Sequence, residues 1–161
     1  MGGREYEAIA RGGDAPSVGA VTAILASGAV ALPSFASAGP YNGRTGRVEA
    51  PDNFTGIERA SLATLYSALM TSLLIESLGS AGEIFVDGPL ARNPLFSGLL
   101  AACVPVGTVR AYPEGGGTRV AAHLAHMRAP AADVPQSVVP LRLPGLLDYQ
   151  ATWRHRLEER Q

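Results

Sequence analysis

The sequence contains no lysine, and all thirteen of its basic residues are arginines. A Walker A phosphate loop requires the lysine that follows its glycines, and a Schiff-base enzyme requires a lysine amine, so both classes are excluded. Basic and acidic residues nearly balance, at a net charge of -1, and no run of basic residues occurs. We therefore expect neither nucleic acid nor a membrane surface as a partner.

Cysteine is almost as scarce. Cys103 is the single cysteine of the sequence, so it forms no intrachain disulfide. Because it lies in an apolar stretch, we expect it in the core. This usage agrees with a reducing compartment, and we expect a cytoplasmic protein. Charged residues make up only 17% of the 161 residues and hydrophobic residues 47%, which is a globular composition with enough chain for one domain.

Long uncharged runs are also rare, and the run from Ser17 to Ala38 resembles a targeting signal. The residues before it are net negative, whereas the start of a signal peptide is positive. Gly28 and Pro33 interrupt the run. We interpret this segment as a buried helix followed by a short strand, in preference to a signal peptide or a membrane span.

Apolar periodicity predicts helices that alternate with strands, which indicates an α/β domain. Helices are expected at 17–28, 56–78, 93–102 and 117–127, and strands at 29–32, 83–86 and 106–112. On the longest helix, the solvent side is predicted at Glu58, Arg59, Ser67 and Glu76. Residues 129–144 are rich in proline and are expected to wrap over the surface. A docking helix is predicted from the spacing of Leu146, Tyr149, Trp153 and Leu157.

Residues 39–47 are rich in turn-forming residues. Two interpretations stay open for this loop. It is either a loop that meets a substrate or another domain, or a plain connection.

Several residues are candidates for chemistry. Asp87, at the end of a strand, is a turn cap or a ligand for a hydroxyl group in preference to a general base. His123 and His126 are three residues apart, but no acid or cysteine cluster accompanies them, so a packing or surface role is favoured over a metal site. The stretch 115–118 either presents backbone N–H groups to a phosphate or is a flexible turn.

Four blocks together resemble the C-terminal domain of FGGY-family carbohydrate kinases, in the actin, hexokinase and Hsp70 superfamily. The blocks are MGGREYE (1–7), ALPSF (31–35) with GPY (39–41), ERASLATLYSALM (58–70) and VDGPLARNPLF (86–96). The resemblance covers about residues 2–125. It implies a partial actin-like (ribonuclease H-like) fold, a small mixed sheet flanked by helices. Residues 1–128 would form an incomplete kinase domain, and residues 129–161 the proline-rich wrap and docking helix of the same domain.

The resemblance also implies a kinase that transfers a phosphoryl group from ATP, with Mg²⁺, to a hydroxyl group of a sugar or polyol. By position, the family's adenosine motif falls on Gly88, Pro89 and Asn93, and its glycine-rich turn near the nucleotide includes Gly116 and Gly117. Pro89 stands where a second glycine is usual and has no N–H to donate. Val120 likewise replaces a usual glycine. Nucleotide contacts altered from those of the family are therefore expected.

In the family, the catalytic aspartate and the first phosphate loop, with its Asp-x-Gly-Thr sequence, belong to the N-terminal part. That sequence is not found here, so we expect a fragment with no catalytic residue, no metal ligand and no kinase activity alone. The substrate would be held through the missing part, whose loss would expose apolar surface and favour self-association. The alternative function is a non-enzymatic nucleotide-binding or interaction module from a degenerate kinase gene. A dinucleotide-binding protein is disfavoured because GxGxxG follows no expected strand.

Overall fold

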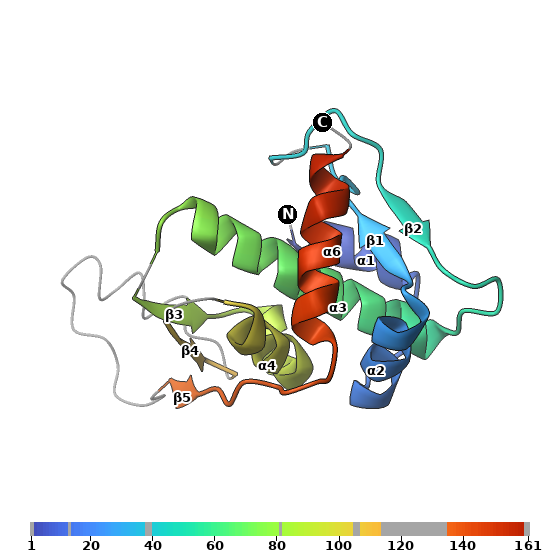
Figure 1. Cartoon of the computed structure of the whole chain (residues 1–161). Helices are drawn as coiled ribbons and strands as arrows, with labels where there is room; N and C mark the ends of the chain where they lie inside the picture. The colour runs from blue at the N-terminus through green and yellow to red at the C-terminus, as the bar shows by residue number, and fades with distance from the viewer. Residues whose placement is uncertain are drawn as a thin grey trace. The chain divides into compact units, whose positions relative to one another are not determined.

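The structure, a computed structural model, describes residues 2–12, 14–37, 40–80, 82–104, 107–113 and 135–159. The chain divides into two compact units, and each is described by itself. The first unit comprises Met1–Thr71 and Arg142–Gln161, and the second comprises Ser72–Leu141. Both units combine helices with small sheets, which confirms the predicted α/β class (Figure 1). None of the described helices is long and apolar enough to cross a membrane.

The first unit contains a two-stranded antiparallel sheet and four helical segments. Its elements are α1 (Gly2–Ala10), α2 (Val18–Ser27), β1 (Val30–Leu32), β2 (Arg47–Glu49), the larger part of α3 (Gly56–Ser77) and α6 (Leu146–Glu158). The start of α2 is capped by Ser17, whose side chain accepts from the Ala20 N–H, and Gly28 ends the helix in a left-handed conformation. The sequence predicted α2 and β1. It did not predict α1 as a helix, and it assigned Arg47, the first residue of β2, to a loop.

The central part of α3 is buried all round. Every residue from Ala60 to Met70 is buried, and Ser67 is only 5% exposed, so its predicted place on the solvent side was wrong. The hydroxyl groups of Ser61, Thr64 and Ser67 donate to carbonyl oxygens four residues earlier, at 2.7, 2.8 and 2.8 Å. Because these bonds satisfy the hydroxyls within the helix, polar residues are tolerated on its buried sides.

The start of α3 is fixed by a capping box formed by Thr55 and Glu58. The Glu58 carboxylate accepts from the Thr55 N–H at 2.8 Å, and the Thr55 hydroxyl oxygen accepts from the Glu58 N–H at 3.2 Å. The hydrogen bond from the Thr55 backbone lowers the pKa of Glu58. The sequence T-x-x-E at 55–58 therefore sets where this helix begins.

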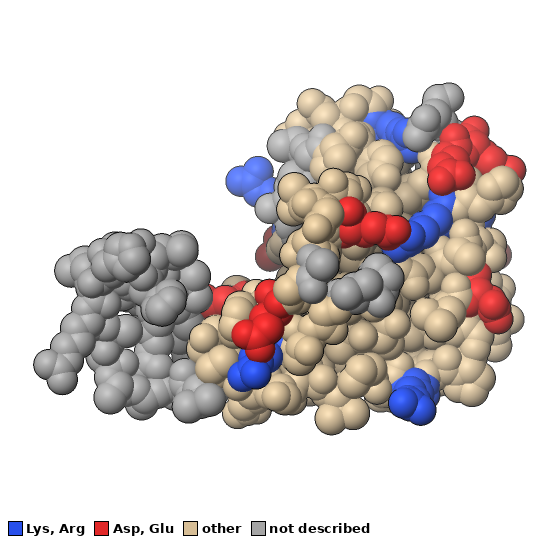
Figure 2. All heavy atoms as spheres, turned by 60° about the vertical axis from the view of Figure 1, so that its left-hand side comes forward, with Lys and Arg blue, Asp and Glu red and all other residues tan. Residues whose placement is uncertain are grey.

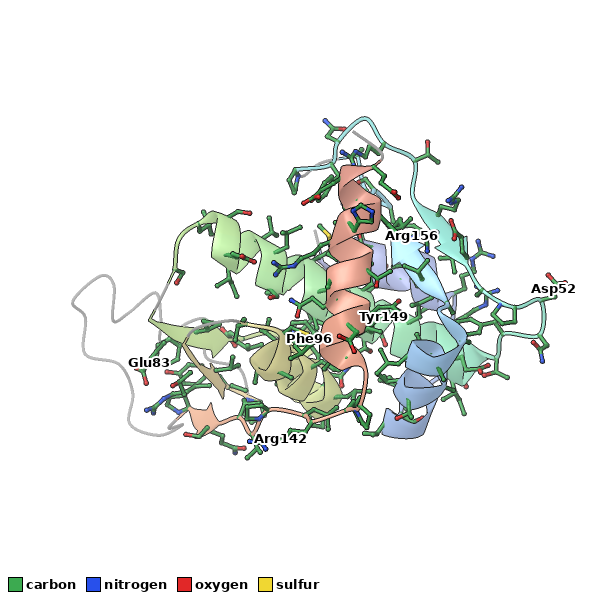
Figure 3. The ribbon with its side chains drawn as sticks, in the orientation of Figure 1. Asp52, Glu83, Phe96, Arg142, Tyr149 and Arg156 are labelled. Carbon is green, nitrogen blue, oxygen red and sulfur yellow. The ribbon has the colours of Figure 1, made fainter. Side chains whose placement is uncertain are left out.

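The C-terminal helix α6, which lies where a helix was predicted, contacts β1 in the first unit. The Trp153 indole N–H donates to the Ala31 carbonyl oxygen at 2.9 Å, and the Tyr149 hydroxyl donates to the Ala29 carbonyl oxygen at 2.7 Å. Farther along α6, Arg156 donates to Glu49 of β2 at 2.5 Å. Tyr149 and Arg156 are labelled on α6 in Figure 3. These bonds join the helix to both strands of the sheet.

The second unit contains a three-stranded sheet in the order β3-β4-β5. Its elements are β3 (Glu83–Val86), η1 (Pro89–Arg92), α4 (Pro94–Cys103), β4 (Thr108–Ala111), β5 (Gln136–Ser137) and the end of α3. Strands β3 and β4 are parallel, and β5 is antiparallel to β4. Cys103 is buried at the end of α4, as predicted. The short β5 was not predicted, because two residues carry no periodicity.

Candidate functional site

The candidate site is the corner where β3 ends and η1 begins, in the second unit. The strand pairing extends to this point, since the Tyr112 N–H donates to the Val86 carbonyl oxygen at 2.9 Å. At the next residue, the Asp87 carboxylate accepts from the N–H of Gly88 at 2.7 Å. Asp87 therefore acts as an acceptor within the turn, the role preferred for it from the sequence.

Gly88 adopts a backbone conformation that only glycine tolerates readily. Its φ is 77° and its ψ is -160°. Among the described residues, no atom lies within 4 Å of a Cβ atom built at this position. Glycine is thus required here by its backbone angles, and no described residue fills the space beside its Cα atom. A flat ring could approach the chain closely at this point.

The short 3-10 helix that follows begins with Pro89. Proline suits this position because its fixed φ matches the helix and its missing N–H would have no partner inside the helix. The turn is closed by the Ala91 N–H, which donates to the Gly88 carbonyl oxygen at 3.0 Å. At this corner, the Gly88 N–H serves Asp87, and Pro89 offers no N–H to a ligand.

Asn93 caps the start of α4. Its Oδ1 atom accepts from the N–H groups of Leu95 at 3.1 Å and Phe96 at 3.3 Å. Asn followed by Pro94 is a typical start of a helix, and the helix was predicted at 93–102. The structure thus gives Asn93 a structural role in holding α4 at the corner.

The corner is also tied to the segment that follows β4. The Arg92 guanidinium donates to the Pro113 carbonyl oxygen at 3.3 Å, and the rings of Phe85 and Tyr112 stack with their centres 6.0 Å apart. The sequence missed both contacts, because they depend on the register between β3 and β4. The chain therefore passes beside the corner just before it enters the glycine-rich turn.

Some predicted positions lie outside the described residues. These are the glycines Gly116 and Gly117, Val120, His123 and His126. Among the described residues, no group of three or more His, Cys, Asp or Glu side chains is arranged to hold a metal ion. Of the predicted cofactor-binding residues, the structure brings Gly88, Pro89 and Asn93 together at one corner.

Comparisons with known proteins agree on one family. Residues 1–135 match the family model described as carbohydrate kinase FGGY, C-terminal domain. None of the curated proteins matches the sequence. A carbohydrate kinase from Novosphingobium aromaticivorans has a similar crystal structure, with a TM-score of 0.75 and 26% identity, over 99% of this chain and 36% of that chain. The fold is thus the actin-like fold that the resemblance implied, and the chain belongs to the family of FGGY carbohydrate kinase C-terminal domains.

Proposed function

We propose that the chain is the nucleotide-binding side of an ATP-dependent sugar or polyol kinase. Its family supports transfer of a phosphoryl group to a carbohydrate hydroxyl. The chain spans 36% of the length of the similar kinase. We therefore propose that the catalytic base, most contacts to phosphate and Mg²⁺, and the sugar site belong to the remaining part of such a kinase. Turnover is expected only when that part is present.

The observation that carries this proposal is the geometry of Gly88. No atom of the described residues lies within 4 Å of a Cβ atom built on it, and the predicted adenosine residues Pro89 and Asn93 lie on the same corner. Adenosine binding requires such a close approach, because a side chain at this position would hold the ring away. The residues present therefore fit the adenosine group of ATP or ADP.

The same geometry predicts how the adenosine is held. The Gly88 N–H serves the Asp87 carboxylate and Pro89 has no N–H, so the contacts at this turn are mainly van der Waals contacts with the backbone. The Oδ1 atom of Asn93 serves the helix cap. From the position of Asn93 in the family's adenosine motif, we propose that its amide group donates a hydrogen bond to the nucleotide.

The test uses two substitutions of Asn93 and calorimetric titration of the chain with ADP. Asn93→Ser keeps an oxygen that can cap α4 but removes the amide group, whereas Asn93→Ala removes both. The melting temperature of each variant measures the loss of the helix cap separately from the loss of ADP affinity. We expect both variants to lose affinity for ADP at least fivefold, and only the alanine variant to lose stability.

The outcomes separate the proposed functions. Full affinity in Asn93→Ser would show that Asn93 is a cap alone and would remove it from the nucleotide site. No binding of ADP or ATP to the unsubstituted chain would contradict the nucleotide-binding proposal and favour the alternative, an interaction module. Turnover of a sugar by this chain alone would contradict the assignment of the base to the remaining part.

A cytoplasmic location and self-association of the chain remain proposals. For self-association, the structure provides large apolar side chains that are well exposed, with Leu78 and Val139 each at 82% and Leu147 at 64%.

A further inference from the structure

A groove of about 460 Å³ lies in the first unit. Four segments line it: α1 near its end with the residue that follows it, Phe35 after β1, the β2 strand with its flanks, and the first turn of α3. Its volume lies in the range of small-molecule sites. The groove is therefore large enough for a small metabolite.

Two arginines, Arg11 and Arg59, are among the residues that line this groove. Within the described ranges, no carboxylate lies within 4.0 Å of either guanidinium group, although Asp52 lines the same groove. Asp52 lies on the loop that joins β2 to α3 (Figure 3). Both arginines thus line the groove, and neither takes part in the ion pairs that the described residues form.

Arg11 also has an unusual backbone. Its φ is 53°, and it is the one residue other than glycine for which the described part of the chain has a positive φ. It directly follows α1, where its N–H donates to the Glu7 carbonyl oxygen at 3.0 Å. The residue that ends a helix in this conformation is usually a glycine. Here the conformation is adopted by Arg11, although a glycine, Gly12, is the next residue. The helix thus ends on a strained arginine whose side chain lines the groove.

The rest of the groove is shaped by close packing. A Cβ atom on Gly46 would lie 2.6 Å from the Phe35 ring and 2.7 Å from the Ser34 carbonyl oxygen, so glycine is required where these segments meet. Phe35 and Val48 supply apolar walls beside the two arginines. A site of this kind combines a place for an anion with a surface for a short carbon chain.

We propose that this groove binds the phosphate group of a small phosphate monoester. A guanidinium group matches the geometry of a phosphate with two parallel hydrogen bonds, and two such groups around one groove favour a doubly charged oxyanion. On the face drawn in Figure 2, small groups of basic and acidic side chains, some of them in contact, lie among uncharged residues. A small anion fits this local charge better than a membrane surface or a nucleic acid, which need an extended basic area.

The test is a titration of the ¹⁵N-labelled chain with glycerol phosphate, followed by NMR, with glycerol as the uncharged control. We expect shifts at Phe35, Gly46 and Val48 with glycerol phosphate and none with glycerol. Arg11→Gly and Arg59→Gln are each expected to raise the dissociation constant at least fivefold. Arg11→Gly is also expected to keep or raise the melting temperature, because glycine adopts the backbone of this position without strain.

Arg142→Gln is the matched control, since Arg142 is exposed and does not line the groove. It should leave the dissociation constant unchanged. An equal loss of affinity in this control would show that glycerol phosphate is attracted only by the net charge of the chain, and it would overturn the proposal. So would shifts that persist in the Arg11→Gly, Arg59→Gln double variant. Orthophosphate in a parallel titration should compete for the same residues, and its failure to do so would also contradict a phosphate site.

Discussion

The hydroxyl group of Tyr66 in α3 donates a hydrogen bond to the Oε1 atom of Glu5 in α1, at 3.0 Å. Both residues are buried, at 2% and 4% exposure. The same Glu5 oxygen accepts from the Phe35 N–H at 3.4 Å, and the Tyr66 ring meets the rings of Phe35 and Trp153 edge to face. One carboxylate oxygen therefore connects α1, α3 and the segment after β1 inside the first unit.

Tyr66→Phe should destabilise the chain. The substitution keeps the ring but leaves Glu5 without its donor from α3, and a buried acceptor that loses its partner costs about 1–3 kcal/mol. Urea unfolding followed by circular dichroism would measure the loss in the free energy of unfolding. Tyr6→Phe is the control in the same part of the unit, because no hydrogen bond of the Tyr6 hydroxyl is seen among the described residues. Equal stability of the two variants would contradict a structural role for the Glu5–Tyr66 bond.

Stability should fall in alkaline solution. Burial raises the pKa of Tyr66 above its usual value of 10.0, and the neighbouring Glu5 carboxylate raises it further. Burial likewise raises the pKa of Tyr149, and Arg156 opposes this shift. Above about pH 10, the unfolded chain releases protons that the folded chain still holds, so the free energy of unfolding decreases as the pH rises. The stabilisation is fully present below that pH.

The alkaline effect can be measured by urea unfolding between pH 8 and pH 11. In Tyr66→Phe the decline should be shallower, since one of the two perturbed hydroxyl groups is gone. A slope identical to that of the unsubstituted chain would show that Tyr66 does not keep its proton in the folded state.

Gly88→Ala should destabilise the chain and weaken nucleotide binding together. No atom of the described residues blocks the added methyl group, so the cost arises from the backbone angles, which only glycine adopts readily, and is about 1–3 kcal/mol. The methyl group would also occupy the space proposed for the adenosine ring. Thermal unfolding and ADP calorimetry on one preparation measure the two effects.

The control for Gly88→Ala is Gly19→Ala. Gly19 lies within α2, where a Cβ atom also meets nothing within 4 Å, and alanine is there expected to stabilise the helix by about 0.5–1 kcal/mol. Normal ADP affinity in Gly88→Ala would place the nucleotide away from this glycine, even if the stability falls as expected.

Helix ends and helix faces could be predicted because their signals are local. Ser17 and Gly28 mark the ends of α2, and Asn93 before a proline marks the start of α4, since each acts on backbone groups only a few residues away. The apolar face of α6 could likewise be predicted from residue spacing, and Trp153, which is buried, lies on it. The same reasoning failed at Ser67. Its hydroxyl group donates a hydrogen bond to a carbonyl oxygen of its own helix, so the side chain can be buried without losing a hydrogen bond.

The sequence by itself determined the alternation of helices and strands, the glycine corner after β3 and the exclusion of lysine-dependent chemistry, all of which follow from residue types and short spacings. Only the tertiary structure decided the rest. Glu5 meets Tyr66 across 61 positions of the chain, and Arg11, directly after α1, comes to line one groove with Arg59 of α3. Such pairs depend on how buried surfaces pack, and packing is set by the whole unit, so no local pattern of residues encodes them.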